Sequence, residues 1–335
     1  MQDVACLAGV SQATVSFVLN DVPGTRISEE TRVRVAEAAQ TLGYRPRAAG
    51  RPRKVASQRV IGMLVDEIAT SPFAALSVEG LQERAWRSGA IVEVSMSGGD
   101  SAYEAAVLRR WAQERVDGVV YASILTREVD PPTTLLRNRA VMLNCHDPEE
   151  RLGSIVPAER RGGEAATDAL IAAGHRRIAF VGGEPWMDAS RQRHEGFRRA
   201  MARHGIEVVA EWVKEGNFLP SGGHEATRAL MSAATRPEAI FCANDAMAVG
   251  CYEALKEGGE RVGETIAVIG YDNQEISQHL TPALSTVLLP HREMGQWCAE
   301  QLLADDIESS QVRLDCPVVL RESHRAPPSP RRSRS

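Results

Sequence analysis

Apolar and polar residues repeat with two different periods along this chain, and the change between them divides it. From residue 3 to residue 42, apolar residues recur at helical spacing in three short segments, interrupted at Gly9 and ended by Gly43. Ser11 and Ser28 are suitable N-caps for the second and third segments. The pattern predicts a small all-helical unit with a tight turn between its first two helices.

Beyond residue 60 the pattern changes to short apolar strands that alternate with amphipathic helices. One set of these units extends to about residue 157, and a second set follows to about residue 288. Such alternation predicts parallel sheets with helices on both faces, so two sets predict two doubly wound subdomains. Ligands of these folds bind in the cleft beside the strand ends. The basic, low-complexity tail 329–335 is expected to be disordered.

Composition narrows the class of protein. At 335 residues, the chain is long enough for two or three domains. We expect no membrane span, because no run of about 18 apolar residues is present. The absence of an apolar export signal predicts a cytoplasmic protein. The six cysteines are scattered without Cys-x-x-Cys spacing, so we expect reduced cysteines, no metal site and no cofactor.

Charge is distributed unevenly along the chain. The formal net charge of the whole chain at pH 7 is −5. Residues 1–60 contain nine Lys and Arg and five Asp and Glu, which gives +4 and leaves −9 for the remainder. A basic N-terminal unit on an acidic body is typical of a protein that contacts DNA at one end only.

The N-terminal residues closely resemble the headpiece of the lac-repressor (LacI/GalR) family of bacterial transcription regulators. The matching segments are Asp3-Val-Ala5, Ala8-Gly-Val-Ser11, Thr14-Val-Ser16, Val18-Leu-Asn20, Ile27-Ser28 and Leu42-Gly-Tyr-Arg-Pro46. The resemblance continues to Leu320-Arg-Glu-Ser323 and so covers nearly the whole chain. It implies a periplasmic-binding-protein-like core, a small-molecule effector, a homodimer and a double-stranded DNA operator.

Pattern and resemblance together give the expected domain limits. In chain order these are a helix-turn-helix headpiece at 1–46, a basic hinge or linker at 47–59, an effector-binding and dimerisation core at 60–328, and the tail. Within the core, the first subdomain is expected at about 60–157 plus 289–322, and the second at about 158–288.

The second helix is expected to lie in the major groove of DNA. By resemblance, Gln12 and Ala13 occupy the positions that vary most with operator sequence, and Gln12 can pair with adenine through two hydrogen bonds. Phe17 departs from the family's usual polar or basic residue, so it either contacts a thymine methyl group or packs against the linker. The expected DNA-contacting residues are Ser11, Gln12, Ala13, Thr14, Ser16, Phe17, Asn20, Tyr44, Arg47, Arg51 and Arg53.

The linker also departs from the family, in which a hinge segment folds into a helix on DNA and inserts a Leu into the minor groove. Arg53 stands where that Leu is expected. Gly50 and Pro52 disfavour a helix by about 1 and about 3 kcal/mol. Gly50-Arg-Pro-Arg53 instead resembles the core of an AT-hook, which lays arginines along a narrow A·T minor groove. Two interpretations stay open: extended binding in the minor groove by Arg51 and Arg53, or a flexible basic linker that contacts only phosphates.

The effector site is expected between the subdomains. Residues 188–197 resemble a family segment whose second arginine, here Arg193, binds ligand, and a guanidinium can clamp two sugar hydroxyls or a carboxylate. The expected effector-contacting residues are Arg193, Asn244, Asp272, Phe218, Asn144, Phe73 and Asp66. Asp245 is expected to cap the helix that follows it. Where the family often has Asp-Asn, this chain has Ala158-Glu159, which leaves the effector's identity open.

The sequence therefore predicts a transcription repressor whose operator affinity is controlled by a small molecule, with sugars the commoner effectors in the family. The alternatives are a purine-type regulator that depends on a corepressor and a sugar-binding protein without DNA function. The chain has no phosphate loop, serine-centred elbow or His-Glu-x-x-His helix, so we do not expect an enzyme.

Overall fold

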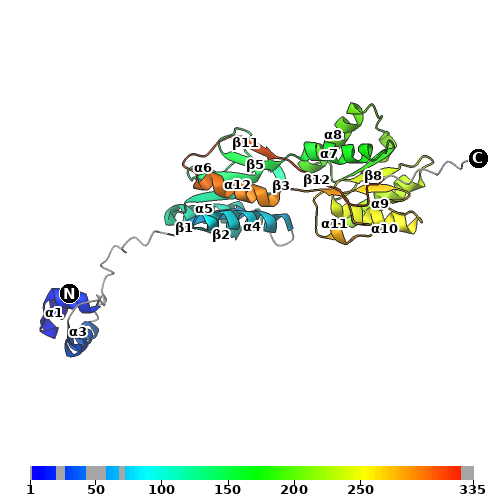
Figure 1. The fold of residues 1–335 in the computed structure, drawn as a ribbon. Coiled ribbons are helices and arrows are strands. Elements are labelled where there is room, and N and C mark those ends of the chain that lie inside the picture. Colours follow the sequence, from blue (N-terminus) through cyan, green and yellow to red (C-terminus); the bar gives the residue numbers. More distant parts are fainter. Residues whose placement is uncertain (1, 20–26, 43–57, 68–71, 326–335) are drawn as a thin grey trace, which may run out of the picture. The chain divides into compact units, whose positions relative to one another are not determined.

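The computed structural model describes residues 2–19, 27–42, 58–67 and 72–325, and the chain divides into two compact units, residues 1–58 and 59–335. The described part of the first unit contains α1 (Gln2–Ala8), α2 (Gln12–Leu19) and α3 (Glu29–Thr41) (Figure 1). Residues Val4, Ala5, Ala8, Val15, Val35, Ala38 and Ala39 form its buried apolar core. This small helical unit is the one that the periodicity predicts.

The ends of these helices follow from local sequence. Gly9 has a φ of +66°, a left-handed conformation that turns the chain between α1 and α2. The Ser11 hydroxyl accepts a hydrogen bond from the backbone N–H of Thr14, and the Ser28 hydroxyl accepts one from that of Thr31. The predicted caps and the predicted break between the first two helices are confirmed.

The second unit contains two parallel sheets in its described residues. The larger has the strand order β11-β5-β4-β3-β1-β2 and the smaller β7-β6-β8-β9. The strands of the larger sheet are β1 (Arg59–Val65), β2 (Ala90–Met96), β3 (Gly118–Glu128), β4 (Ala140–His146), β5 (Gly153–Pro157) and β11 (Gln311–Leu314). Those of the smaller are β6 (Ile178–Gly182), β7 (Val213–Glu215), β8 (Ala239–Cys242) and β9 (Ala267–Ile269). The predicted fold class, a helical headpiece with an α/β core of two parallel sheets, is confirmed.

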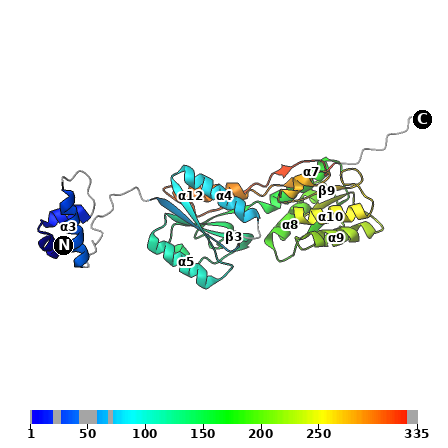
Figure 2. The same cartoon turned by 90° about the horizontal axis from the view of Figure 1, so that it is seen from below.

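Helices cover both faces of the larger sheet. They are α4 (Pro72–Arg87), α5 (Ser101–Glu114), the short α6 (Thr133–Leu136) and α12 (His291–Leu303). Figure 2 shows α4 and α12 on one face and α5 on the other. Two separate apolar clusters fill these faces: one includes Leu81 and Met294, and the other includes Leu108 and Trp111.

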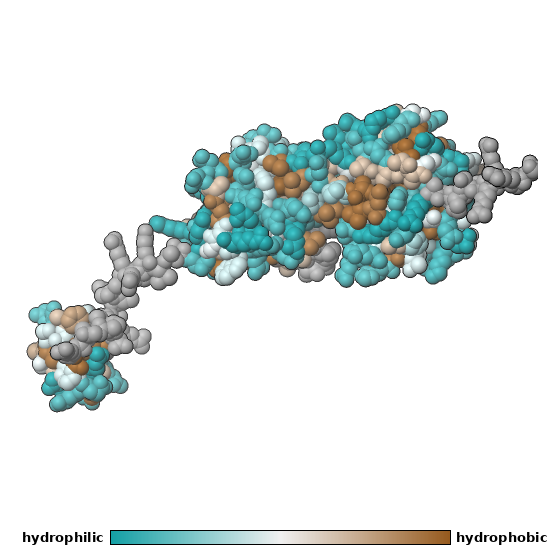
Figure 3. All heavy atoms as spheres, in the orientation of Figure 1, coloured by the Kyte–Doolittle hydropathy of each residue, from teal (hydrophilic) through white to brown (hydrophobic). Residues whose placement is uncertain are grey.

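The smaller sheet is covered in the same way. Its helices are α7 (Glu159–Ala172), α8 (Asp188–Arg203), α9 (Pro220–Ser232), α10 (Asp245–Glu257) and α11 (Ile276–His279), with a 3₁₀ turn at Ala210–Trp212. One apolar cluster continues through this subdomain, and Phe180, Phe197, Phe241 and Tyr271 are its largest fully buried side chains. Figure 3 shows that hydrophilic residues cover most of the visible surface around these cores.

The chain returns to the first subdomain near its end. Helix α12 packs on α4 so closely that a Cβ added to Gly295 would lie 2.1 Å from the carbonyl oxygen of Ser77. Strand β11 then pairs in parallel with β5.

The end of the segment expected to return to the first subdomain, 289–322, also forms contacts with the second. Strand β12 (Val318–Val319) pairs antiparallel with β10 (Thr286–Val287), and Ser323 hydrogen-bonds to the carbonyl oxygen of Val268. These residues therefore contact the second subdomain, because Val268 lies within β9 and the residue before β10, Ser285, bridges to Ile269 of the same strand.

Candidate effector site

Arg193 is a buried cation that is already bonded on most of its edges. Its Nε and Nη2 donate to the two carboxylate oxygens of Glu159, at 2.8 and 2.9 Å. Its Nη1 donates to the carbonyl oxygen of Ala243 and, at 3.2 Å, to Oδ1 of Asp272. The guanidinium also lies 3.8 Å from the centre of the Tyr271 ring. Protein acceptors thus use four of its five N–H donors.

Close helix packing produces this pairing. Glu159 is the first residue of α7, and Arg193 lies in α8. A Cβ added to Gly163 would lie 2.5 Å from the carbonyl oxygen of Arg193, and one added to Gly196 would lie 2.2 Å from that of Arg160. Only glycine permits such an approach, so these two residues bring Glu159 against Arg193.

A cavity of about 170 Å³ lies beside this group. Of the expected effector residues, Arg193, Asn244, Asp272, Phe218 and Asn144 line it. It is bordered from the first subdomain by residues such as Thr126 and from the second by residues such as Met187. The structure therefore brings five of the seven expected residues together.

Three of these five residues have backbone conformations that non-glycine residues rarely adopt. The φ angles of Asn144, Phe218 and Asp272 are +56°, +55° and +107°. Conformations of this kind cluster at binding sites, where the surrounding structure holds them. Their concentration around one cavity supports its assignment as a site.

The other two expected effector residues do not line the cavity in the described structure. The carboxylate of Asp66 accepts hydrogen bonds from the Ser123 hydroxyl and the Ile124 N–H, at 2.8 and 2.9 Å. Asp66 therefore holds the middle of strand β3, at Ser123 and Ile124. The side chain of Phe73 lies outside the described residues.

The two asparagines are also occupied by the protein. Asn144 donates to the carbonyl oxygens of Ser123 and Ile124. The side chain of Asn244 accepts from the N–H of Met247, so Asn244 caps α10. The expectation that Asp245 is the cap is wrong. Asp245 instead accepts from the Gln274 N–H and the Thr286 hydroxyl, because its side chain points toward the strand ends.

Burial controls the ionisation of this region. It raises the pKa of Asp245 to about 7 and that of Asp272 well above its usual range, although Arg193 opposes both shifts. Burial, aided by Arg193, lowers the pKa of His291 to about 4, so its imidazole is neutral at pH 7. The neutral His291 adds no second positive charge, so Arg193 is the one cation among the described residues that line this cavity.

Sequence reasoning missed two titratable residues that line the cavity, Glu159 and His291. The sequence marks Glu159 as a departure from the family pattern, and this was its only signal. His291 begins α12, and nothing in its sequence context separates it from an ordinary helix start.

The described DNA-contacting candidates lie on α2 and its cap. Ser11, Gln12, Ala13 and Phe17 are exposed, while Thr14 and Ser16 are half-buried. The Phe17 side chain is 41% exposed and lies outside the buried headpiece core. The candidates Asn20, Tyr44, Arg47, Arg51 and Arg53 lie outside the described residues.

Comparison with known proteins agrees with this architecture. Residues 1–47 match the description "bacterial regulatory proteins, lacI family", and residues 167–324 match a periplasmic binding protein-like domain. The repressor PurR of Vibrio cholerae is 36% identical over 306 residues, which cover 90% of each chain. The chain belongs to the lacI family of bacterial regulatory proteins. The ribose operon repressor of Escherichia coli K12 is 35% identical and covers 96% of this chain and 98% of its own length.

Solved structures of lacI-family members have the same fold. The lac repressor dimer bound to operator and the anti-inducer ONPF is 29% identical, with a TM-score of 0.68 over 97% of this chain and 98% of that one. The complex of the regulator CelR with cellobiose is 30% identical, with a TM-score of 0.65 over 96% and 98%. This lacI-family member is a DNA-binding, effector-regulated transcription repressor and not an enzyme.

Proposed function

We propose that this repressor is controlled by a small uncharged molecule, rich in hydrogen-bond donors, that binds in the Arg193 cavity. The observation that carries this proposal is the bidentate pair between Arg193 and Glu159. Because Glu159 holds the edge of the guanidinium that would clamp an anion, a carboxylate or phosphate on the ligand has little of Arg193 left to bind.

The charge and size of the cavity support the same ligand class. Two acidic side chains, Glu159 and Asp272, accept hydrogen bonds from one guanidinium, so the positive charge of Arg193 is already balanced and an anionic ligand gains little from it, whereas hydroxyl groups find acceptors. The volume of about 170 Å³ is below the roughly 300–1,000 Å³ of clefts that hold drug-sized ligands. A monosaccharide fits this description better than a disaccharide.

The headpiece is proposed to read DNA through the exposed face of α2, with Gln12 and Ala13 toward base edges and Ser11, Thr14 and Ser16 toward the DNA backbone.

We further infer a homodimer. Strand β2 is an edge of the larger sheet, and Ile91, Val94 and Met96 on it are exposed. An apolar open edge favours pairing with a second copy. A repressor of bacterial genes acts on DNA, so we infer a cytoplasmic location.

No helix within the described residues is both long and apolar enough to cross a membrane.

Thermal unfolding with a ligand panel tests the effector class. The panel contains ribose and glucose, the anions ribose 5-phosphate and gluconate, and the purine base hypoxanthine. A ligand at about 100 times its Kd stabilises the native state by about 2.7 kcal/mol. We expect a neutral sugar to raise the Tm of the native chain and to lose this effect in Phe218→Ala, which opens the cavity and removes none of the hydrogen bonds of Arg193.

Two results contradict the proposal. A shift with the anionic sugars alone rejects the uncharged class, and a shift with hypoxanthine alone selects the purine-type regulator. The proposed DNA recognition is tested separately, by selecting the sites that the protein binds from random duplex DNA. A pseudo-palindromic site is expected, because a symmetric dimer imposes its symmetry on the operator.

A further inference from the structure

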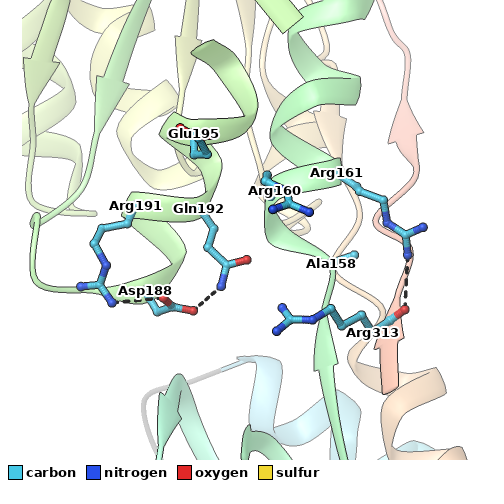
Figure 4. Close-up of a pocket in the computed structure, with 8 residues that line it drawn as sticks. All are labelled: Ala158, Arg160, Arg161, Asp188, Arg191, Gln192, Glu195 and Arg313. Atoms are coloured by element: carbon cyan, nitrogen blue, oxygen red, sulfur yellow. Dashed lines mark hydrogen bonds and ion pairs between the residues drawn. The ribbon is translucent and has the colours of Figure 1, made fainter. Parts of the chain in front are cut away.

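A second hollow, of about 650 Å³, lies beside the first turns of α7 and α8 (Figure 4). Its charged lining consists of four arginines, Arg160, Arg161, Arg191 and Arg313, with two acids, Asp188 and Glu195. None of the expected effector residues lines it. It is therefore separate from the Arg193 cavity.

The two acids of this lining are already paired, and two of its arginines are not. Asp188 binds Arg191 at 3.1 Å, and Glu195 binds Arg199 at 2.7 Å. Arg161 binds Asp315 at 2.6 Å, outside the lining. Within residues 59–67 and 72–325, Arg160 and Arg313 have no ion-pair partner, and Nη2 of Arg313 donates one hydrogen bond to the side-chain oxygen of Gln311 at 2.6 Å. Figure 4 shows both arginine side chains extending into the space between α7 and α8.

Two helix N-termini add to this positive field. The N-cap residues of α7 and α8 are Ala158 and Met187, and neither forms a side-chain cap. The first-turn N–H groups of helices 14 and 16 residues long are thus left without a side-chain acceptor. The acid that begins α7, Glu159, does not neutralise its helix end there, because it is turned toward Arg193. The acid that begins α8, Asp188, does line the hollow and is one of the two acids in its charge count.

We propose that this hollow is a second ligand site, specific for small molecules that carry a diphosphate or two phosphate groups. The four arginines and two acids leave a formal charge of +2, and each unpaired guanidinium can take one phosphate through two parallel hydrogen bonds. The volume accommodates such a group together with an attached organic part.

This site joins the two subdomains. Arg160 belongs to α7 of the second subdomain, whereas Arg313 belongs to β11 of the larger sheet. A diphosphate held by both arginines stabilises the subdomain arrangement in which they face each other. Its binding is therefore coupled to any change in that arrangement, and the coupling is reciprocal.

Titration calorimetry of the full chain with inorganic pyrophosphate tests the proposal. We expect one site per chain, with an affinity that falls as ionic strength rises. Arg160→Gln and Arg313→Gln should each weaken binding by about tenfold or more, the effect of losing a charge-assisted hydrogen bond. The double variant Arg109→Gln/Arg261→Gln removes the same charge from exposed arginines that do not line the hollow, and it should bind like the native chain.

The proposal is overturned if the native chain does not bind pyrophosphate at millimolar concentration, or if the control variant loses as much affinity as Arg160→Gln/Arg313→Gln. Loss of pyrophosphate binding in Phe218→Ala also overturns it, because that result places the anion in the Arg193 cavity. Inorganic sulfate separates a diphosphate site from a general anion site, and equal affinity for both rejects the stated specificity. None of these readouts depends on which molecule occupies the Arg193 cavity.

Discussion

Glu159 and Arg193 differ in what their removal leaves behind. Arg193→Met leaves Glu159 and Asp272 buried without a counter-charge, so we expect a loss of about 3–5 kcal/mol in the free energy of unfolding. Glu159→Gln should cost less, because Asp272 and the carbonyl oxygen of Ala243 still hold the guanidinium. Urea unfolding of both variants at pH 7 measures the difference. Equal losses would show that Glu159 alone stabilises Arg193.

Asp245 makes the free energy of unfolding depend on pH, and the sign of this dependence follows from its pKa. Its pKa is about 7 in the native state against an ordinary value of 3.8. Between these values the native chain keeps a proton that the unfolded chain has lost, so this contribution to stability falls as pH rises and levels off above about 7. Between pH 4 and pH 7, the free energy of unfolding, measured with urea, should therefore fall less in Asp245→Asn than in the native chain.

Asp147 supplies the matched control for that measurement. The hydrogen bond from Arg151 is the main cause that lowers the pKa of Asp147 to about 2. Its contribution to stability is complete above 3.8 and is lost only as pH falls toward 2. Asp147→Asn should leave the slope between pH 4 and pH 7 unchanged, and an equal change in both variants would refute the assignment to Asp245.

Among the elements, α4 and α12 depend on glycine at their contact. A Cβ at Gly80 would lie 2.0 Å from the carbonyl oxygen of Arg292, and one at Gly295 would lie 2.1 Å from that of Ser77. Gly295→Ala must push the helices apart, which should lower the free energy of unfolding by about 1–3 kcal/mol.

Gly258→Ala is the control for this packing effect. Gly258 follows α10 with a right-handed conformation, and an added Cβ would meet only atoms 3.4 Å or more away. Urea unfolding of Gly258→Ala should show no loss in the free energy of unfolding. A gain of about 0.4–1 kcal/mol is expected, because alanine reduces the conformational freedom of the unfolded chain. If Gly295→Ala proves equally harmless, the two helices are not held by direct backbone contact.

Elements with strong periodicity could be predicted from the sequence, and short ones could not. The helices of the headpiece and the alternating units of the core follow from apolar spacing and from caps such as Ser28. Strands β10 and β12 contain two residues each, too few to show a period. The site shows the same limit. Arg193 is recognisable by its neighbours in the sequence, but Glu159 lies 34 positions before it, and nothing in the sequence indicates that the two side chains meet.

At the scale of the whole molecule, the two interpretations of the linker, residues 47–59, differ in how its arginines contact DNA. If Arg51 and Arg53 lie along the minor groove, Arg51→Gln/Arg53→Gln should weaken binding to an operator with an A·T centre far more than to one with a G·C centre. If they contact only phosphates, both operators should lose affinity equally. Fluorescence anisotropy with the two duplexes at one salt concentration distinguishes the interpretations.

The order of the elements also has a consequence for biosynthesis. The larger sheet lacks β11 until the chain has been made as far as residue 314, so β5 emerges with one side unpaired. The whole of the second subdomain is translated in the interval. During that time the nascent protein carries an open strand edge of the kind that other chains can join. Strand β11 thus protects the sheet as well as completes it, and premature termination before β11 should yield aggregates rather than a smaller repressor.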